Sequence, residues 1–159
     1  MRFGKNWGYR DSCSLLVLEI EGAHKPRTRA TSTNNDLAEN LMKSVEELDV
    51  FKLAHELALK VYKVTITFPK EETSNLVSQM RRAAISVGMN LVEGSMRLNS
   101  REFRHFVGIA RGSAADVSYQ PLLARDLGYI EKDVYDELHS GYERVGQMLA
   151  RLAQSLEHR

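Results

Sequence analysis

The chain has 159 residues, of which 43% are hydrophobic and 27% are charged, a balance typical of one globular domain. Its 22 lysines and arginines against 21 aspartates and glutamates give a net charge of +1, which excludes a general attraction to nucleic acid. The single cysteine, Cys13, excludes an internal disulfide framework and a multi-cysteine zinc site, and it predicts a reducing, cytoplasmic location. The early apolar run at residues 15–20 is far too short to span a membrane.

Residues 1–41 differ from the remainder of the chain. They contain Pro26 and the polar stretch TRATSTNND, and they show no sustained helical or strand period. A lone strand in this segment has no partner with which to pair. We therefore expect a poorly ordered N-terminal tail at residues 1–41 and one helical domain at residues 42–159. Because the helical pattern begins at Met42, we hypothesise that the native start is Met42 and that residues 1–41 are a non-native extension.

Four helical blocks follow, separated by short turn signals and without a strand period between them. The first block is predicted to run from Ser44 or Asp49 to Phe68, and Pro69 ends it. Ser44 and Asp49 are also its candidate N-caps. Its apolar residues are spaced for one helix face: Val50, Leu53, Ala54, Leu57, Val61 and Val64.

The second block starts near Thr73 or Ser74, and its apolar residues recur in alternating steps of four and three, which predicts a near-heptad seam. Gly94 is predicted to end this block as a left-handed C-terminal residue. Asn99 and Ser100 can cap the third block, because both side chains accept hydrogen bonds from the first turn of a helix.

Pro121 lies inside the third block, where proline removes one backbone hydrogen bond at a cost of about 3 kcal/mol. We therefore predict a kink or break at residues 118–121. Gly128 closes the third block, and Asp133 is predicted to cap the fourth, whose seam runs to Leu156.

Each block carries one apolar stripe, and burial at about 25 cal/mol per Å² favours an arrangement in which the four stripes meet. The predicted fold class is all-α, an antiparallel up-and-down four-helix bundle. Small residues on the second and third helices should let those two backbones approach closely. These residues are Ala83, Ala84, Gly88, Gly108, Ala110, Gly112 and Ala114.

Residues 78–111 carry a local excess of positive charge, because they contain six arginines, no lysine and two glutamates. Guanidinium groups make bidentate contacts with phosphate or carboxylate. Five of them are candidate nucleic-acid-binding residues: Arg81, Arg97, Arg101, Arg104 and Arg111. The alternative is that these arginines are solvated or pair with acids of neighbouring helices or subunits.

Arg81 and Arg82 are adjacent on an otherwise apolar helix, so they point about 100° apart and cannot both face water if the stripe is buried. A charge at a helix seam is tolerated mainly when it is paired. One of the two arginines is therefore expected to meet an acid. We expect a structural polar network in which Arg82 pairs with Glu93 or Asp116, with Asn90 nearby.

The sequence contains no clear pattern for catalysis or metal binding. His55 and Glu56 begin like a zinc-protease motif, but Leu59 stands where the second histidine is required. Ser86 and Ser113 have no histidine and aspartate at a spacing that activates serine. We therefore predict a protein that is not an enzyme and binds no cofactor or metal.

Four segments, in this order and spacing, resemble the bacterial four-helix bundle proteins encoded in intervening sequences of 23S ribosomal RNA genes: FKLAHELALKVYKVTITFP, QMRRAAISVGMNLVEG, REFRHFVGIARGSAADV and LLARDLGYI. The resemblance covers residues 50–156 and implies an antiparallel bundle that assembles into a ring-like homopentamer without established catalytic activity. It also implies similarity to the accessory variability proteins of diversity-generating retroelements, which engage nucleic acid through a basic ring surface. The positions that match are Arg81, Arg82, Asn90, Glu93, Gly94, Phe103, Ser113, Asp116, Leu123 and Gly128.

Two positions depart from the family pattern. Gly88 stands where the family usually has proline, and Pro121 stands where it has an apolar helix former. The expected function is a non-enzymatic, ring-forming bundle that binds RNA or DNA backbone through an arginine-rich surface. The alternative is a structural or protein-interaction bundle whose arginines make contacts between subunits.

Overall fold

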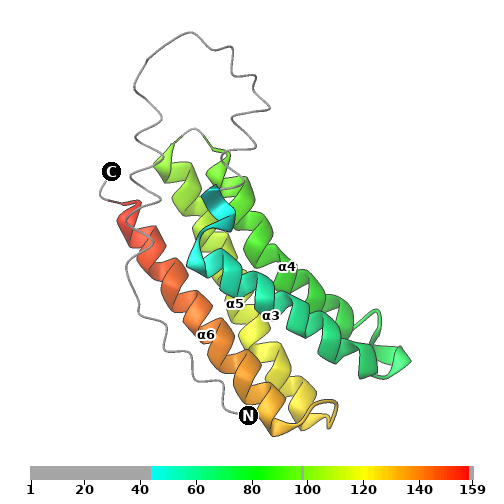
Figure 1. Ribbon diagram of the computed structural model, residues 1–159. Helices are drawn as coiled ribbons and strands as arrows, with labels where there is room; N and C mark the ends of the chain where they lie inside the picture. The colour runs from blue at the N-terminus through cyan, green and yellow to red at the C-terminus, as the bar shows by residue number, and fades with distance from the viewer. Residues whose placement is uncertain (1–43, 98, 158–159) are drawn as a thin grey trace, which may run out of the picture.

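The computed structural model describes residues 44–97 and 99–157, which form an antiparallel up-and-down bundle of four long helices (Figure 1). The predicted fold class is therefore confirmed. The expected tail at residues 1–41 and the hypothetical start at Met42 lie outside the described residues. The helices are α3 (Asp49–Val64), α4 (Leu76–Ser95), α5 (Ser100–Asp126) and α6 (Lys132–Ser155), with the short 3₁₀ turns η1 (Thr65–Thr67) and η2 (Lys70–Glu72) between α3 and α4.

The two longest helices, α5 and α6, pack along each other, and α4 packs on the other side of α5. The shorter α3 closes the bundle between α4 and α6 (Figure 1). This order gives four seams between neighbouring helices, at α3–α4, α4–α5, α5–α6 and α3–α6.

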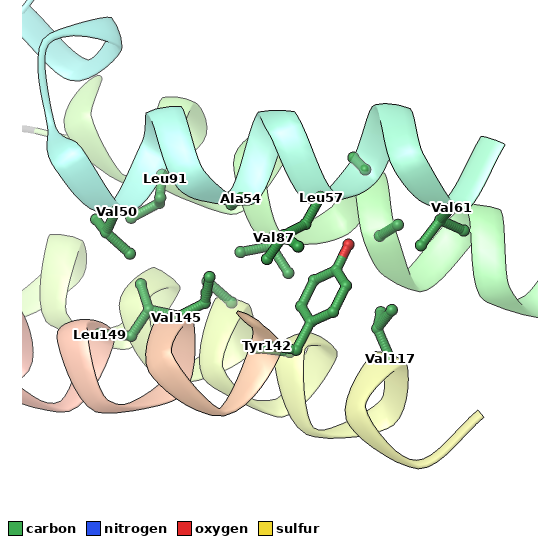
Figure 2. Packing of buried hydrophobic residues seen from close by; sticks show 14 of the residues in the cluster. Val50, Ala54, Leu57, Val61, Val87, Leu91, Val117, Tyr142, Val145 and Leu149 are labelled. Atoms are coloured by element: carbon green, nitrogen blue, oxygen red, sulfur yellow. The ribbon is translucent and has the colours of Figure 1, made fainter. Parts of the chain in front are cut away.

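The apolar stripes of all four helices meet in one core (Figure 2). Tyr142 of α6 lies in it with only 1% of its surface exposed, and its ring extends toward α3. Its hydroxyl has no hydrogen-bond partner, and burial raises the pKa of Tyr142 above its ordinary value. The core also includes Val50, Ala54, Leu57, Val61, Met80, Val87, Leu91, Val107, Val117, Val145 and Leu149.

The helix ends in the first half of the domain differ from their predicted positions. No side chain caps α3, so the predicted caps were wrong, and the helix ends at Val64 instead of Phe68. The Thr65 hydroxyl donates to the Val61 carbonyl at 2.8 Å, and the backbone tightens there into the 3₁₀ turn η1. Helix α4 begins at Leu76, whose N–H donates to the Glu72 carboxylate at 3.2 Å, a cap that the sequence analysis missed.

The local signals around α5 were more informative. The Asn99 side chain accepts a hydrogen bond from the Glu102 N–H at 2.9 Å, which confirms the predicted cap. Gly128 has a φ of +76° and ends the helix as predicted. The prediction for Asp133 was wrong, because α6 already begins at Lys132, and Asp133 instead accepts from the Val134 N–H within the first turn.

Helix α5 passes through Pro121 without a break, so of the predicted kink or break at residues 118–121 the break was wrong. Pro121 is buried, and α4 and α6 pack along the two sides of α5. We attribute the continuity to this packing, which offsets the cost of the hydrogen bond that proline cannot make. His139 of α6 adds a polar contact next to the proline, with its Nδ1 3.2 Å from the Ser118 carbonyl oxygen.

Gly94 lies within α4 and is not left-handed, so the predicted role was also wrong. A Cβ at this position would lie 2.7 Å from both Phe103 Cδ2 and Phe106 Cβ, which makes Gly94 the close contact between α4 and α5. Gly108 and Gly112 were expected to contribute to this contact, but an added Cβ would meet nothing within 4 Å at either position. Both glycines are exposed on α5.

Candidate functional site

The half-buried Arg81 lies in the seam between α3 and α4. Its Nε donates to the Thr65 hydroxyl at 2.8 Å, and its guanidinium group lies 4.8 Å from the centre of the Tyr62 ring. It also donates to the Tyr62 carbonyl at 3.5 Å. Through these contacts Arg81 holds α4 against the end of α3. Few of its N–H groups are therefore free to bind a phosphate.

Three of the predicted arginines gather where α4 ends and α5 begins. Arg97 forms an ion pair with Glu93 and lies 4.7 Å from the centre of the Phe106 ring. Arg104 pairs with Glu157 at 2.9 Å. Arg101 is exposed and forms no ion pair within residues 44–97 and 99–157. Two of the three cations are therefore already neutralised by carboxylates.

The exposed Arg111 belongs to a different surface. It lines a hollow of about 490 Å³ between α5 and α6, together with Ser118, His139 and Glu143. The structure therefore distributes the five candidate arginines over the α3–α4 seam, one end of the bundle and the α5–α6 hollow. They do not form one basic patch within the subunit.

The α5–α6 hollow also holds a hydroxyl, an imidazole and a carboxylate. The Ser118 Oγ lies 3.0 Å from Nδ1 of His139, and the Nε2 of that ring lies 4.0 Å from the Glu143 carboxylate. The same Nδ1 also approaches the Ser118 carbonyl oxygen, which can only accept, and this favours a proton on Nδ1. An imidazole with its proton on Nδ1 cannot accept the serine proton there. The arrangement therefore joins α5 to α6 and does not activate Ser118 as a nucleophile.

The four residues of the expected polar network all line one hollow of about 420 Å³ between α4 and α5: Arg82, Asn90, Glu93 and Asp116. The hydrogen bonds in it differ from those predicted. The Asn90 amide donates to the Ser86 carbonyl at 2.7 Å, and the Ser86 and Ser113 hydroxyls are 2.9 Å apart. The network across α4 and α5 therefore depends on serine and asparagine.

Arg82 does not form the predicted ion pair with Glu93 or Asp116 inside the described part of the subunit. Arg82 and Asp116 are exposed, and no ion pair joins them, while Glu93 pairs with Arg97. The expectation that Arg81 or Arg82 meets an acid was also wrong there, because Arg82 points outward and Arg81 bonds to neutral groups. The hollow contains one further group, the buried Oε1 of Gln120, which has no hydrogen-bond partner and which the sequence analysis did not identify.

A third hollow, of about 480 Å³, lies between α3 and α4 and is mainly apolar. Gly88 lies in it, and a Cβ there would make only an ordinary contact of 3.5 Å with Phe51. His55 and Glu93 supply the polar groups. The remaining lining residues are apolar: Phe51, Ala54, Ala58, Ala84, Ile85, Met89 and Val92.

Between the α3–α4 and α4–α5 hollows, α4 and the residue that follows it present an exposed stripe that we call the outward face of α4, made of Arg82, Ile85, Met89, Glu93 and Met96. Steps of three and four residues place them on one side of the helix. Ile85 is 40% and Met89 is 63% exposed. Helix α4 therefore carries two stripes with apolar residues, one buried in the core and one exposed on the surface of the subunit.

The described residues contain no group of three metal-ligating side chains, and no helix among them is long and apolar enough to cross a membrane. The fold and its surfaces define an all-α bundle whose distinguishing features are two hollows flanking one exposed helix face. The chain belongs to the 23S rRNA-intervening sequence protein family, whose sequence profile matches residues 46–151. This confirms the resemblance noted from the sequence.

A similar fold occurs in a solved structure from Bacteroides thetaiotaomicron VPI-5482, described as a protein with unknown function from the S23 ribosomal protein family. The two chains superpose with a TM-score of 0.60 at 18% sequence identity, over 65% of this chain and 97% of that chain. At this identity the similarity establishes the fold alone. Comparison with curated proteins finds no match.

Proposed function

We propose that this protein is a non-enzymatic helical bundle that assembles with copies of itself and acts through its surfaces. The outward face of α4 is the observation that carries the proposal, because Ile85 and Met89 are exposed next to an apolar hollow. Exposed apolar side chains grouped beside an apolar hollow are typical of an interaction site.

The finer form of the proposal is the ring-like homopentamer that the family implies. A head-to-tail ring requires two different surfaces on each subunit. Exposed apolar side chains occur in two groups that support this requirement. The first, at the end of α3 and in η1, contains Tyr62 and Ile66, and the second, on α5 and just after it, contains Ile109, Tyr119, Leu123 and Leu127.

Light scattering on the purified protein tests self-assembly. The subunit has a mass of 18.1 kDa, so the proposal expects a mass several times this value and the ring expects five times it. A mass of one subunit at every protein concentration would reject both forms of the proposal.

Binding to RNA or DNA backbone is a second candidate function, located at the end of the bundle where α4 meets α5. Arg101 supports it, because this guanidinium is exposed and carries no ion pair with the described residues. Arg97 and Arg104 are close by but are already paired with acids, which weakens the local field. A ring would repeat this end in every subunit, and multivalent contact would compensate for the weakness of each site.

The variant Arg97→Glu/Arg101→Glu tests this candidate. We expect it to lower the affinity for all nucleic-acid sequences alike and to reduce the salt dependence of binding by about two counterions, because both side chains would contact phosphates. The measurement is a salt titration with a 23S ribosomal RNA fragment. Lys63→Glu/Lys132→Glu reverses two charges elsewhere on the surface as the control. Absence of wild-type binding at low salt, or an equal loss in the control, would reject the candidate.

A further inference from the structure

We propose that the outward face of α4 is a two-fold interface, on which a second copy of this chain places the same face with the two α4 helices antiparallel. The inference rests on the self-assembly proposed above and assigns a surface to it. A contact of this kind is isologous and closes with two copies, so it joins two subunits or two rings and cannot by itself propagate a ring.

The spacing of the exposed residues defines the register of the pair. When two α4 helices are laid antiparallel with residue 87 of each at the two-fold axis, Ile85 of each copy faces Met89 of the other. The same register sets Arg82 of each copy opposite residues 92–93 of the other, and therefore beside Glu93. Each of these contacts occurs twice, so a single stripe supplies both halves of the interface.

The centre of this interface is apolar and adjoins a hollow. Ile85 and Met89 project from α4, and the α3–α4 hollow of about 480 Å³ lies directly beside them. Gly88 lines this hollow and has no side chain to fill it. The flexible Met89 side chain of the other copy suits a hollow of this kind, because methionine adapts to irregular apolar gaps.

The charges at the two ends of the face select the antiparallel orientation. Arg82 is exposed and has no ion pair with the described residues, and Arg97 contacts only one of the two carboxylate oxygens of Glu93. In a parallel pair, Arg82 would face Arg82 and Glu93 would face Glu93, which is repulsive. The antiparallel pair replaces both repulsions with attractions between opposite charges.

The flank of the face next to α5 is polar and would form the edge of the interface. Asp116 is exposed there, and the buried Oε1 of Gln120 has no partner. Both groups accept hydrogen bonds, and both line the α4–α5 hollow with Arg82. An apolar centre with polar groups at its edge is the usual composition of a protein–protein interface.

A charge-swap cycle tests the interface. Arg82→Glu and Glu93→Arg should each weaken self-association about tenfold or more, and the double variant should return to within about threefold of wild type, because the exchange restores both ion pairs. Sedimentation equilibrium at low salt measures the association, and thermal unfolding followed by circular dichroism verifies that each variant is folded. If the association constant of the double variant is lowered by as much as the two single-variant losses multiplied together, the interface is overturned.

The cycle separates the two proposals. A wild-type protein that assembles while all three variants keep its association constant would overturn the α4 interface and leave self-assembly standing. A wild-type protein that remains a single subunit would reject both.

A cross-linking experiment covers the case in which the charge variants fail to fold. In a Cys13→Ser background, mixing the Ile85→Cys and Met89→Cys proteins under mild oxidation should give more disulfide-linked dimer than either protein alone, because these positions face each other. Mixing Ile85→Cys with Ser140→Cys, an exposed position on α6, is the control. Equal cross-linking in both mixtures would overturn the proposed register.

Discussion

Replacing Leu91 by alanine should lower the free energy of unfolding by about 2–5 kcal/mol, the range for a buried leucine that leaves a cavity. Leu91 belongs to the core stripe of α4, has no exposed surface and is part of the buried cluster shown in Figure 2. The loss should be large because all four helices contribute to this core. Urea unfolding followed by circular dichroism, at one fixed subunit concentration, measures the effect.

The matched control is the same substitution at Leu59 of α3, which is 50% exposed. Because a half-exposed leucine has less apolar surface to lose and leaves no enclosed cavity, we expect Leu59→Ala to cost less than about 1 kcal/mol. Similar losses at the two positions would show that α4 does not bury the stripe described here.

Replacing Gly94 by alanine should destabilise the protein by about 1–3 kcal/mol, the usual cost of overpacking a tight contact. The new Cβ would lie 2.7 Å from Phe103 Cδ2 and from Phe106 Cβ. The Phe106 Cβ is attached directly to the α5 backbone, so it cannot move aside without shifting the helix. The thermal midpoint and the urea midpoint should both fall.

The same change at Gly112 should have the opposite sign. An added Cβ at Gly112 meets nothing within 4 Å, and alanine is favoured over glycine inside a helix by about 1 kcal/mol. Gly112→Ala is therefore expected to raise the free energy of unfolding slightly. If Gly94→Ala also stabilised the protein, the close approach of α4 and α5 at Gly94 would be contradicted.

The bundle could be predicted from the sequence because the spacing of the apolar residues indicates each helix. Helix ends with a strong local signal were also predictable, as Asn99 and Gly128 demonstrate. Ends without a standard capping pattern were not. The Thr65 hydroxyl at the end of α3 and the Glu72 carboxylate at the start of α4 each bond a backbone group four residues away, which the usual capping signals do not predict.

Pro121 and Gly94 illustrate the same limit in helix interiors. Local rules predict that Pro121 breaks a helix and that Gly94 ends one, but packing from neighbouring helices determines both outcomes. In α5 the flanking helices outweigh the missing hydrogen bond. In α4 the glycine provides space for two phenylalanines of the adjacent helix.

The residues of the candidate site were partly predictable as a set. Arg82, Asn90, Glu93 and Asp116 do share one hollow, but their bonding partners depend on which side chains face each other across α4 and α5. The partners of Arg81 and Arg104 lie in other elements and carry no short-range sequence signal. Ile85 and Met89 were visible in the sequence, but their exposure became clear only when the core stripe was placed.

Methionine oxidation tests most directly whether the outward face of α4 is covered in the assembled protein. Dilute peroxide converts accessible methionines to sulfoxides, and peptide mass spectrometry gives a rate for each position. Met89 is 63% exposed in the single subunit, whereas Met148 is 7% exposed and is an internal reference for protection. We predict that Met89 in the assembled protein is oxidised almost as slowly as Met148, and faster when dilution separates the subunits. The account would be contradicted if Met89 were oxidised as fast as in the unfolded chain and if this rate did not change with protein concentration.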